Sequence, residues 1–192
     1  MIACIIGGGP SAKDLDTEQL PGLVIGVNDA GLLKPCHAWF TLDHNYARAA
    51  RERITRLPSS TELHICTYHK NFHHFEGWRV QLWRRVAQAM PMLDGATLSS
   101  GPGTTPGCSG YVAINLAAAL GAERIYLYGY DFHQPYSYFF DDKPFPRKAV
   151  REVVDSFTRV ARHYERAGIE VINCNPNSAI KAFKHHEVTH AA

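Results

Sequence analysis

Glycines and small polar residues gather at two places where they could bind a phosphate. The segment Gly7-Gly8-Gly9-Pro10-Ser11 follows an apolar run, and Ser109-Gly110 ends a second glycine-rich stretch, SSGPGTTPGCSG. Glycine lets the backbone approach an anion closely, and the start of a following helix offers free N–H groups and positive potential. Serine is also a favoured residue at the start of a helix. The pattern predicts two turns that together hold the phosphates of a nucleotide or an activated donor.

The first glycine segment also fits the loose dinucleotide pattern G-x-G-x-x-A. A dinucleotide site needs an acidic residue at the end of the second strand, where it holds the ribose hydroxyls. Here the second strand-like run, 23–27, ends in Asn28. Pro21-Gly22 also limits the helix after the glycines to a short one, and no P-loop pattern occurs. The sequence therefore favours a nucleotide cradle of another kind over an NAD site.

Side chains that could move a proton follow two other strand-like runs. Asp131, His133 and Tyr138 follow the run 124–130, and the pair Asp43-His44 follows the run 37–42. An unperturbed imidazole titrates near about pH 6.5, which suits a general acid or base. We predict Asp131, His133 and Tyr138 as the catalytic group, with Asp43-His44 as a second acid and imidazole pair. If Mg²⁺ takes part, Asp43 and Asp131 are the carboxylates that fit it as ligands.

The eleven histidines and five cysteines predict neither a metal site nor a disulfide framework. No C-x-x-C pair occurs, and three cysteines lie in strand-like runs, where a thiol acts as a small buried hydrophobe. The histidine pairs 69/73 and 186/190 have the helical spacing of a zinc site. The first pair lies in a polar stretch without a companion carboxylate or cysteine, and the second lies near the end of the chain.

Apolar runs alternate with helical patterns along the chain, which predicts a single Rossmann-like α/β domain with a mostly parallel sheet and helices on both faces. Strands are expected at 2–6, 23–27, 37–42, 62–67, 124–130 and 170–174. Helices are expected directly after Ser11 and at 45–56, 78–90, 111–120 and 147–167. Because the carboxyl ends of parallel strands meet at one edge of the sheet, the polar loops described above should meet there too.

The stretch 78–90 carries an apolar stripe at helical spacing, with three arginines off the stripe. A helix packed on the sheet with a solvated basic face is one interpretation. A lid over the site and a basic helix resting on a membrane or a nucleic acid are the others. We expect one nucleotide-binding domain over 1–192, with 71–106 as a lid or loop region.

Composition places the chain among globular proteins. Apolar residues make up 45% and charged residues 20% of its 192 residues, near the averages of such proteins. The formal net charge of +2 is too small to favour a nucleic-acid partner. No apolar run approaches the roughly 18 residues of a membrane span. We expect a cytoplasmic protein that binds a nucleotide-activated small molecule; peripheral membrane contact and a homo-oligomer are left open.

Several segments together carry a resemblance to known proteins. In chain order these are GGGPSAKDLDTEQLP, Asn28, CSGYVAINLAAALGAERIYLYGYDFHQPYSYFF and NPNSAI. They resemble the bacterial sialyltransferases of glycosyltransferase family 42, and the related MptE-like 6-hydroxymethylpterin diphosphokinase domain. The match runs in order from Ile2 to Phe183 but leaves out 45–98. The sialyltransferase resemblance implies a Rossmann-like domain with a lid, which transfers a sugar from a CMP-activated donor to a glycan-type acceptor without an obligatory metal.

The resemblance also implies roles for individual residues. Gly8 and Ser11 correspond to the phosphate and ribose end of the donor site, and Asn28 to a residue that touches the donor. Ser109 and Gly110 correspond to residues that hold the donor, and Asn177 and Ser178 correspond to residues near its nucleobase. Tyr138 corresponds to a tyrosine that bonds the leaving phosphate. The donor-binding set predicted from the loops and the resemblance is Gly7, Gly8, Gly9, Ser11, Asn28, Ser109, Gly110, Asn177 and Ser178.

The chain departs from the family at positions that bear on catalysis. Gly8 stands where the family has asparagine, Pro106 stands where it has arginine, and His133 replaces a second tyrosine. No histidine lies between His133 and His163, where the family's catalytic base is expected. A nucleotide-sugar-dependent glycosyltransferase is the favoured function. The alternatives are an MptE-like diphosphokinase or other nucleotide-dependent phosphotransferase that uses Mg²⁺, and a non-catalytic nucleotide- or glycan-binding module of bacterial or phage origin.

Overall fold

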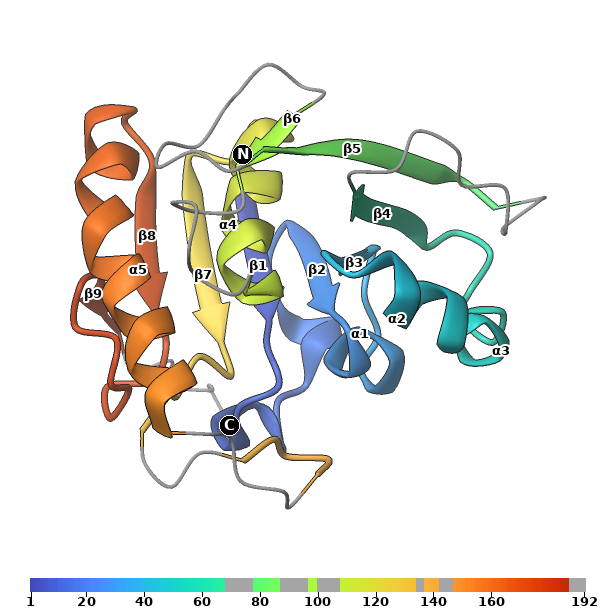
Figure 1. Ribbon diagram of the computed structural model, residues 1–192, viewed down its shortest axis with the longest axis horizontal. Helices are drawn as coiled ribbons and strands as arrows, with labels where there is room; N and C mark the ends of the chain where they lie inside the picture. The colour runs from blue at the N-terminus through green and yellow to red at the C-terminus, as the bar shows by residue number, and fades with distance from the viewer. Residues whose placement is uncertain (68–77, 87–96, 100–107, 134–136, 142–146, 187–192) are drawn as a thin grey trace.

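The computed structural model describes residues 1–67, 78–86, 97–99, 108–133, 137–141 and 147–186. Within these residues a single nine-stranded sheet has the order β6-β5-β4-β3-β2-β1-β7-β8-β9, and every pairing in it is parallel (Figure 1). The strands are β1 (Ile2–Ile6), β2 (Leu23–Val27), β3 (Ala38–Thr41), β4 (Glu62–Thr67), β5 (Val80–Val86), β6 (Thr97–Ser99), β7 (Arg124–Tyr128), β8 (Glu170–Asn173) and β9 (Lys184–His185). The predicted parallel α/β fold is confirmed.

The central strands are buried on both faces, as their continuous apolar runs predict. In β1 the side chains of Ala3 and Ile5 enter one core cluster, while Cys4 and Ile6 enter another on the opposite face. This alternation follows from the two-residue period of a strand. All five cysteines are free, and Cys4 and Cys66 are fully buried. Both thiols lie within strands and pack as small hydrophobes, as predicted.

Helices cover both faces of the sheet. Two long helices, α4 (Ser109–Ala119) and α5 (Arg147–Arg166), pack on the face of the largest core cluster. The short helices on the other face are α1 (Asp29–Leu33), α2 (His44–Ala49), α3 (Arg51–Ile54) and the 3-10 turn η1 (Pro10–Ala12); a second 3-10 turn, η2, spans Thr17–Gln19. The helix expected at 45–56 is thus two short helices that meet at Ala50.

The helix predicted at 78–90 is wrong, because residues 80–86 form the strand β5. Trp78, Val80 and Leu82 pack against one core cluster, whereas Trp83 enters the cluster on the opposite face of the sheet. The apolar residues at helical spacing therefore serve two faces of a strand. The indole Nε1 of Trp83 donates a hydrogen bond of 3.0 Å to Nδ1 of buried His64 on β4, which fixes the pairing of the two strands.

Two strands, β5 and β6, fall within the range 71–106 that was expected to form a lid or loop region; the rest of that range lies outside the described residues. The histidine pairs 69/73 and 186/190 also fall wholly or partly outside them. Among the residues that the structure describes, no helix is long and apolar enough to cross a membrane.

The order of the strands reverses beside β1. From β1 the chain builds the sheet outward to β6, and then returns through α4 to place β7 on the other side of β1 (Figure 1). The segments that follow β1 and β7 leave the sheet beside each other here, and the N–H of Gly9 donates to the Gly129 carbonyl. In open parallel sheets this switch point is where ligands bind, beyond the carboxyl ends of the strands.

Candidate functional site

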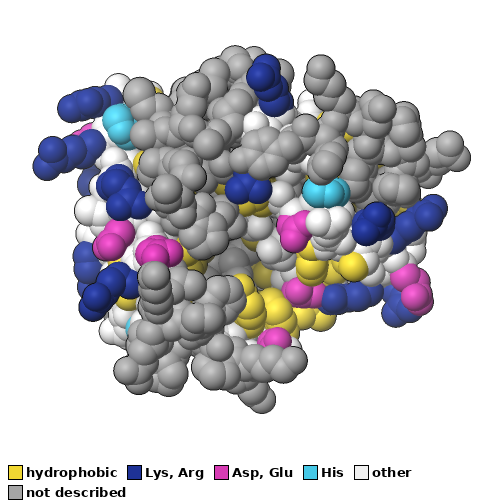
Figure 2. Space-filling view, in the orientation of Figure 1, with side chains coloured by type: hydrophobic (Ala, Val, Ile, Leu, Met, Phe, Trp, Pro, Cys, Tyr) yellow, Lys and Arg dark blue, Asp and Glu magenta, His cyan; other side chains and the backbone are white. Residues whose placement is uncertain are grey.

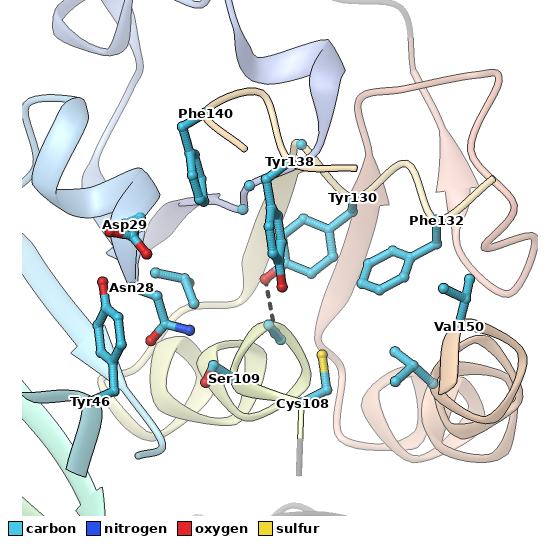
Figure 3. A pocket seen from close by; sticks show the side chains of 16 residues that line it. Asn28, Asp29, Tyr46, Cys108, Ser109, Tyr130, Phe132, Tyr138, Phe140 and Val150 are labelled. Atoms are coloured by element: carbon cyan, nitrogen blue, oxygen red, sulfur yellow. Dashed lines mark hydrogen bonds between the residues drawn. The ribbon is translucent and has the colours of Figure 1, made fainter. Parts of the chain in front are cut away.

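A cavity of about 450 Å³ lies at the switch point, between the loops after β1, β2 and β7 and the start of α4 (Figure 3). Aromatic side chains form much of its wall: Tyr46 comes from α2, and Tyr130, Phe132, Tyr138 and Phe140 come from the segment after β7. Six of the residues predicted from the sequence line it: Gly7, Gly8, Asn28, Ser109, Gly110 and Tyr138. The two glycine-rich turns predicted to share one ligand therefore do face a common cavity.

The first glycine segment lies against the end of β7. The N–H of Gly7 donates to the carbonyl of Tyr128 at 2.8 Å, and the N–H of Gly9 donates to that of Gly129 at 2.9 Å. A Cβ on Gly8 would lie 2.5 Å from Cδ1 of Tyr138, and one on Gly9 would overlap the Asp131 carboxylate. Glycine is required at both positions because neighbouring side chains occupy the space that a side chain would need.

Tyr138 forms the wall opposite these glycines. Its ring stacks on Phe140 with centroids 5.0 Å apart and an interplanar angle of 7°. The N–H of the intervening Phe139 donates to the Gly8 carbonyl at 2.8 Å, which ties this segment to the glycine loop. Burial raises the pKa of the Tyr138 hydroxyl well above its ordinary value, and the nearby Cys108 and Asp29 raise it further. The hydroxyl that points into the cavity is therefore a hydrogen-bond donor at neutral pH (Figure 3).

Asn28 is held in a backbone conformation that non-glycine residues rarely adopt, with φ 51° and ψ −130°. Its N–H donates to the Phe40 carbonyl at 3.0 Å, and its own carbonyl accepts from the Trp39 indole at 2.9 Å. The side-chain Oδ1 is buried and has no hydrogen-bond partner among the residues that the structure describes. Backbone strain and an unsatisfied buried amide, each costly, concentrate at ligand sites.

An acidic residue follows Asn28 directly. Asp29 lines the cavity and forms an ion pair of 2.5 Å with Nη1 of Arg53. The Tyr46 hydroxyl points toward the same carboxylate (Figure 3). Burial raises the pKa of Tyr46, and the negative charge of Asp29 adds to this effect. The cavity thus has a carboxylate beside the end of β2, one residue later than a dinucleotide site would place it.

The start of α4 closes the cavity from below in the view of Figure 3. The Tyr130 hydroxyl donates to the Gly110 carbonyl at 2.8 Å, and a Cβ on Gly110 would lie 3.2 Å from the Tyr130 ring. Burial raises the pKa of the Cys108 thiol, although the N–H groups of Tyr111 and Gly110 oppose this. A neutral thiol is a poor nucleophile, so Cys108 contributes shape. Eleven residues long and largely buried, α4 presents the positive end of its dipole here.

Asp131 lies behind the cavity wall. It is 1% exposed, and its carboxylate accepts hydrogen bonds from the N–H of Ser11 at 3.3 Å, from Ser11 Oγ at 3.1 Å, and from the Asn175 amide. The buried Ser178 hydroxyl donates to the Tyr130 carbonyl at 2.5 Å. These contacts join the first glycine loop to the NPNS segment after β8. Asp131, Ser11 and Ser178 therefore hold the loops in place and do not line the cavity.

The remaining predicted residues also lie outside the lining. Gly9 contacts Asp131, and His133 is exposed beyond Phe132, a residue with φ 52°. Asn177 is exposed, and its N–H donates to Asn175 Oδ1 at 2.9 Å. No group of three or more histidine, cysteine, aspartate or glutamate residues suited to a metal ion occurs in the described part of the chain.

A second cavity of about 320 Å³ lies beside the first, at the carboxyl ends of β3, β4 and β5. Ser109 lines both cavities. The predicted pair Asp43-His44 lies here together with Arg85, which a helix at 78–90 would have placed on its basic face. Asp43 caps α2, because its carboxylate accepts from the N–H groups of Asn45 at 2.8 Å and Tyr46 at 3.2 Å.

Fold and cavity together define a Rossmann-like α/β protein with a cavity at its topological switch point. No protein-family model matches the sequence, and no curated protein matches it either. Solved structures do share the fold. A MAf glycosyltransferase from Magnetospirillum magneticum AMB-1 has a TM-score of 0.63 and 16% identity over 97% of this chain. The chain spans 33% of that protein.

The sialyltransferase CstII shares the fold over most of its own length. Its complex with a trisaccharide acceptor and CMP has a TM-score of 0.53 and 20% identity, covering 96% of this chain and 85% of that one. The Campylobacter jejuni enzyme in complex with CMP-3FNeuAc has a TM-score of 0.52 and 19% identity, covering 95% and 84%. The fold expected from the family 42 resemblance is confirmed, and it is a fold that glycosyltransferases use.

Proposed function

We propose that this chain is a glycosyltransferase that binds a CMP-activated sugar in the cavity at the switch point. The observation that carries the proposal is Asn28: a strained residue that lines the cavity and whose buried amide oxygen has no partner in the described structure. A nucleotide that donates a hydrogen bond to this oxygen satisfies a group that is costly to leave unpaired. The CstII structures bind CMP on the same fold, which supports the choice of cytidine nucleotide.

The phosphate fits between the first glycine loop and the start of α4. Gly7 and Gly8 line one side of the cavity, and Ser109 and Gly110 line it at the positive end of the helix dipole. The Tyr138 hydroxyl, which is protonated at neutral pH, donates a hydrogen bond to the phosphate oxygen on which charge develops as the sugar leaves. In this proposal Tyr138 stabilises the leaving group.

The other predicted residues support the donor from outside the lining. Asp131 acts as a positioning residue, because it joins the Ser11 loop to the segment that carries Asn177 and Ser178. We place the nucleobase of the donor near that segment. His133, which the sequence suggested as a catalytic acid or base, is exposed and is not part of the cavity lining. No metal ion is needed, since the tyrosine and the helix start supply the stabilisation of charge.

Binding and turnover test this proposal together. Isothermal titration with CMP, UMP, AMP, ATP and NAD, with and without Mg²⁺, should show binding of CMP without the metal. Asn28→Ala should weaken CMP binding roughly tenfold, the effect of about 1.4 kcal/mol. Tyr138→Phe should slow release of CMP from CMP-sialic acid about 10- to 100-fold while CMP still binds.

The proposal has clear contrary outcomes. Binding of ATP only in the presence of Mg²⁺ would replace it with the diphosphokinase function. Binding of CMP without any turnover of an activated sugar would indicate a nucleotide-binding module. Glu18→Ala is a suitable control variant, because Glu18 is exposed and lies on η2, outside both cavities. It should bind CMP as the wild type does.

A further inference from the structure

The second cavity carries groups that the proposed donor site does not use. It lies where β3, β4 and β5 end, and Asp43, His44, Thr67 and Arg85 line it. Because all three strands run parallel, with Thr41 opposite Ile65 and Thr67 opposite Arg84, their carboxyl ends bring these residues to one edge of the sheet. In the space-filling view basic, acidic and histidine side chains lie near one another beside the central hollow (Figure 2).

Ser109 connects this second cavity to the donor cavity, since it lines both of them. Ser109 is also the first residue of α4, where the phosphate of the proposed donor lies. A molecule in the second cavity therefore approaches the donor at its phosphate end, where the bond to the sugar breaks. An acceptor bound there lies close to the anomeric carbon, the atom that its oxygen must reach.

The position of His44 is fixed by its neighbours along the chain. The N–H of Asp43 donates to Oγ1 of buried Thr41 at 3.1 Å, which turns the chain as it leaves β3. The carboxylate of Asp43 then caps α2, whose first residue is His44. His44 is half-buried, so it has limited freedom and still faces solvent. Such a residue can both meet a substrate and exchange a proton with water.

We propose that the second cavity is the acceptor subsite, that its ligand is a saccharide hydroxyl, and that His44 is the general base of the transfer. The inference rests on the proposed glycosyltransferase function. The acceptor oxygen forms a bond to the anomeric carbon of the donor sugar, and the bond from that carbon to the phosphate oxygen breaks with its electron pair leaving on CMP. The proton of the acceptor hydroxyl moves to the imidazole of His44 and from there to water.

The groups around His44 suit an acceptor of this kind. Arg85 lines the cavity, and a guanidinium group offers N–H donors that suit sugar oxygens. The Asp43 carboxylate has backbone donors of its own, Asn45 and Tyr46. His44 is therefore the side chain in this cavity that can serve as a general base, the role that histidine takes most often in enzymes. It would fill the role for which the family 42 resemblance offers no histidine between His133 and His163.

The hydrolysis of CMP-sialic acid tests His44 without knowledge of the natural acceptor, because water then serves as the acceptor. In His44→Ala, kcat should fall about 10²- to 10⁴-fold, the usual contribution of a general base. The Kd of CMP should change less than threefold, which also reports that the variant is folded. Added imidazole should restore part of the rate in His44→Ala, an effect that a merely structural role would not produce. His44→Gln should be equally slow.

The controls separate this inference from the function on which it rests. His186→Ala changes an exposed histidine that lies outside both cavities and should leave kcat and CMP binding unchanged. If the wild type fails to bind CMP, the proposed function fails and this inference fails with it. If CMP binds and the donor turns over, but His44→Ala keeps the wild-type kcat, only the inference is overturned. Loss of turnover in His133→Ala, with His44→Ala unaffected, would assign the base to His133. Binding without turnover in the wild type would leave no base to assign and overturns the inference.

Discussion

Replacement of Asn28 by glycine should stabilise the protein and weaken its nucleotide binding at the same time. Asn28 has φ 51° and ψ −130°, a region that glycine enters without steric cost. Its backbone is held there by hydrogen bonds with Phe40 and Trp39, which a glycine would keep. The substitution therefore removes the strain and the side-chain amide but leaves the contacts that shape the loop.

The two effects can be sized separately. A non-glycine residue in such a region costs about 1–3 kcal/mol, and the greater freedom of glycine in the unfolded chain returns about 0.5–1 kcal/mol of that. Asn28→Gly should therefore raise the free energy of unfolding by up to about 2 kcal/mol. For a chain of this size that corresponds to a rise in Tm of up to about 8 °C. Loss of the amide should weaken CMP binding by about 1–2 kcal/mol, roughly five- to thirtyfold in Kd.

Urea denaturation and isothermal titration measure these two quantities. Asn28→Ala is the matched control, because it removes the same amide while its Cβ keeps the strain. It should lose CMP affinity as Asn28→Gly does, and it should be less stable than Asn28→Gly because the strain remains. If Asn28→Gly is less stable than the wild type, the backbone of Asn28 is not strained as argued. If its CMP affinity equals that of the wild type, the Asn28 amide does not face the nucleotide.

Three further predictions concern the surroundings of the cavity. Gly8→Ala should destabilise the protein by about 1–3 kcal/mol in urea denaturation, because its Cβ would lie 2.5 Å from Cδ1 of Tyr138. In a Tyr138→Ala background most of this cost should disappear, and an undiminished cost would contradict the steric explanation. Asp131→Asn should lower the free energy of unfolding by about 1.5–3 kcal/mol, because an amide nitrogen would face the donors of Ser11 and Asn175. It should also weaken CMP binding, and unchanged stability would refute the role of Asp131 in joining the two loops. Burial lowers the pKa of His64 below its ordinary 6.5, so the unfolded chain takes up a proton at a higher pH than the folded one. The free energy of unfolding should therefore fall as the pH drops below about 6.5, by at most about 1.4 kcal/mol per pH unit. Urea denaturation at several pH values should show a weaker fall in His64→Gln, and an equal fall would contradict the prediction.

Much of the sheet could be predicted from the sequence because its central strands are buried on both faces. The expected ranges 2–6, 23–27 and 62–67 coincide with β1, β2 and β4. Continuous apolar runs bounded by Gly7, Pro21-Gly22 or similar turn residues leave few alternatives for such strands. The edge of the sheet was harder. In β5 the residues that face the two core clusters, Leu82 and Trp83, are adjacent and happen to fit a helical stripe as well.

The candidate site could be predicted in part, for a related reason. Loops at the carboxyl ends of parallel strands must meet, so the sequence alone was enough to expect that Gly8, Asn28 and Ser109 share a ligand. The sequence carried no sign that Tyr46 would reach the same cavity, since it lies within a short helix between two strands. It also could not show that Asp131 turns away from the cavity. That depends on Asn175, which is 44 residues distant along the chain.

Gly8 links the resemblance to the chemistry of the cavity. The family 42 sialyltransferases that this sequence resembles have asparagine at the corresponding position, so glycine there could be read as loss of a donor contact. In the structure the stacked rings of Tyr138 and Phe140 occupy the space of a side chain on residue 8. Restoring asparagine there would therefore displace the hydroxyl that we assign to the leaving phosphate. Asn28 lines the same cavity, and its amide oxygen has no partner among the described residues. The cavity therefore has a side-chain amide even though residue 8 is glycine. On the function that we propose, glycine at position 8 therefore indicates a rearranged donor site and not a lost one.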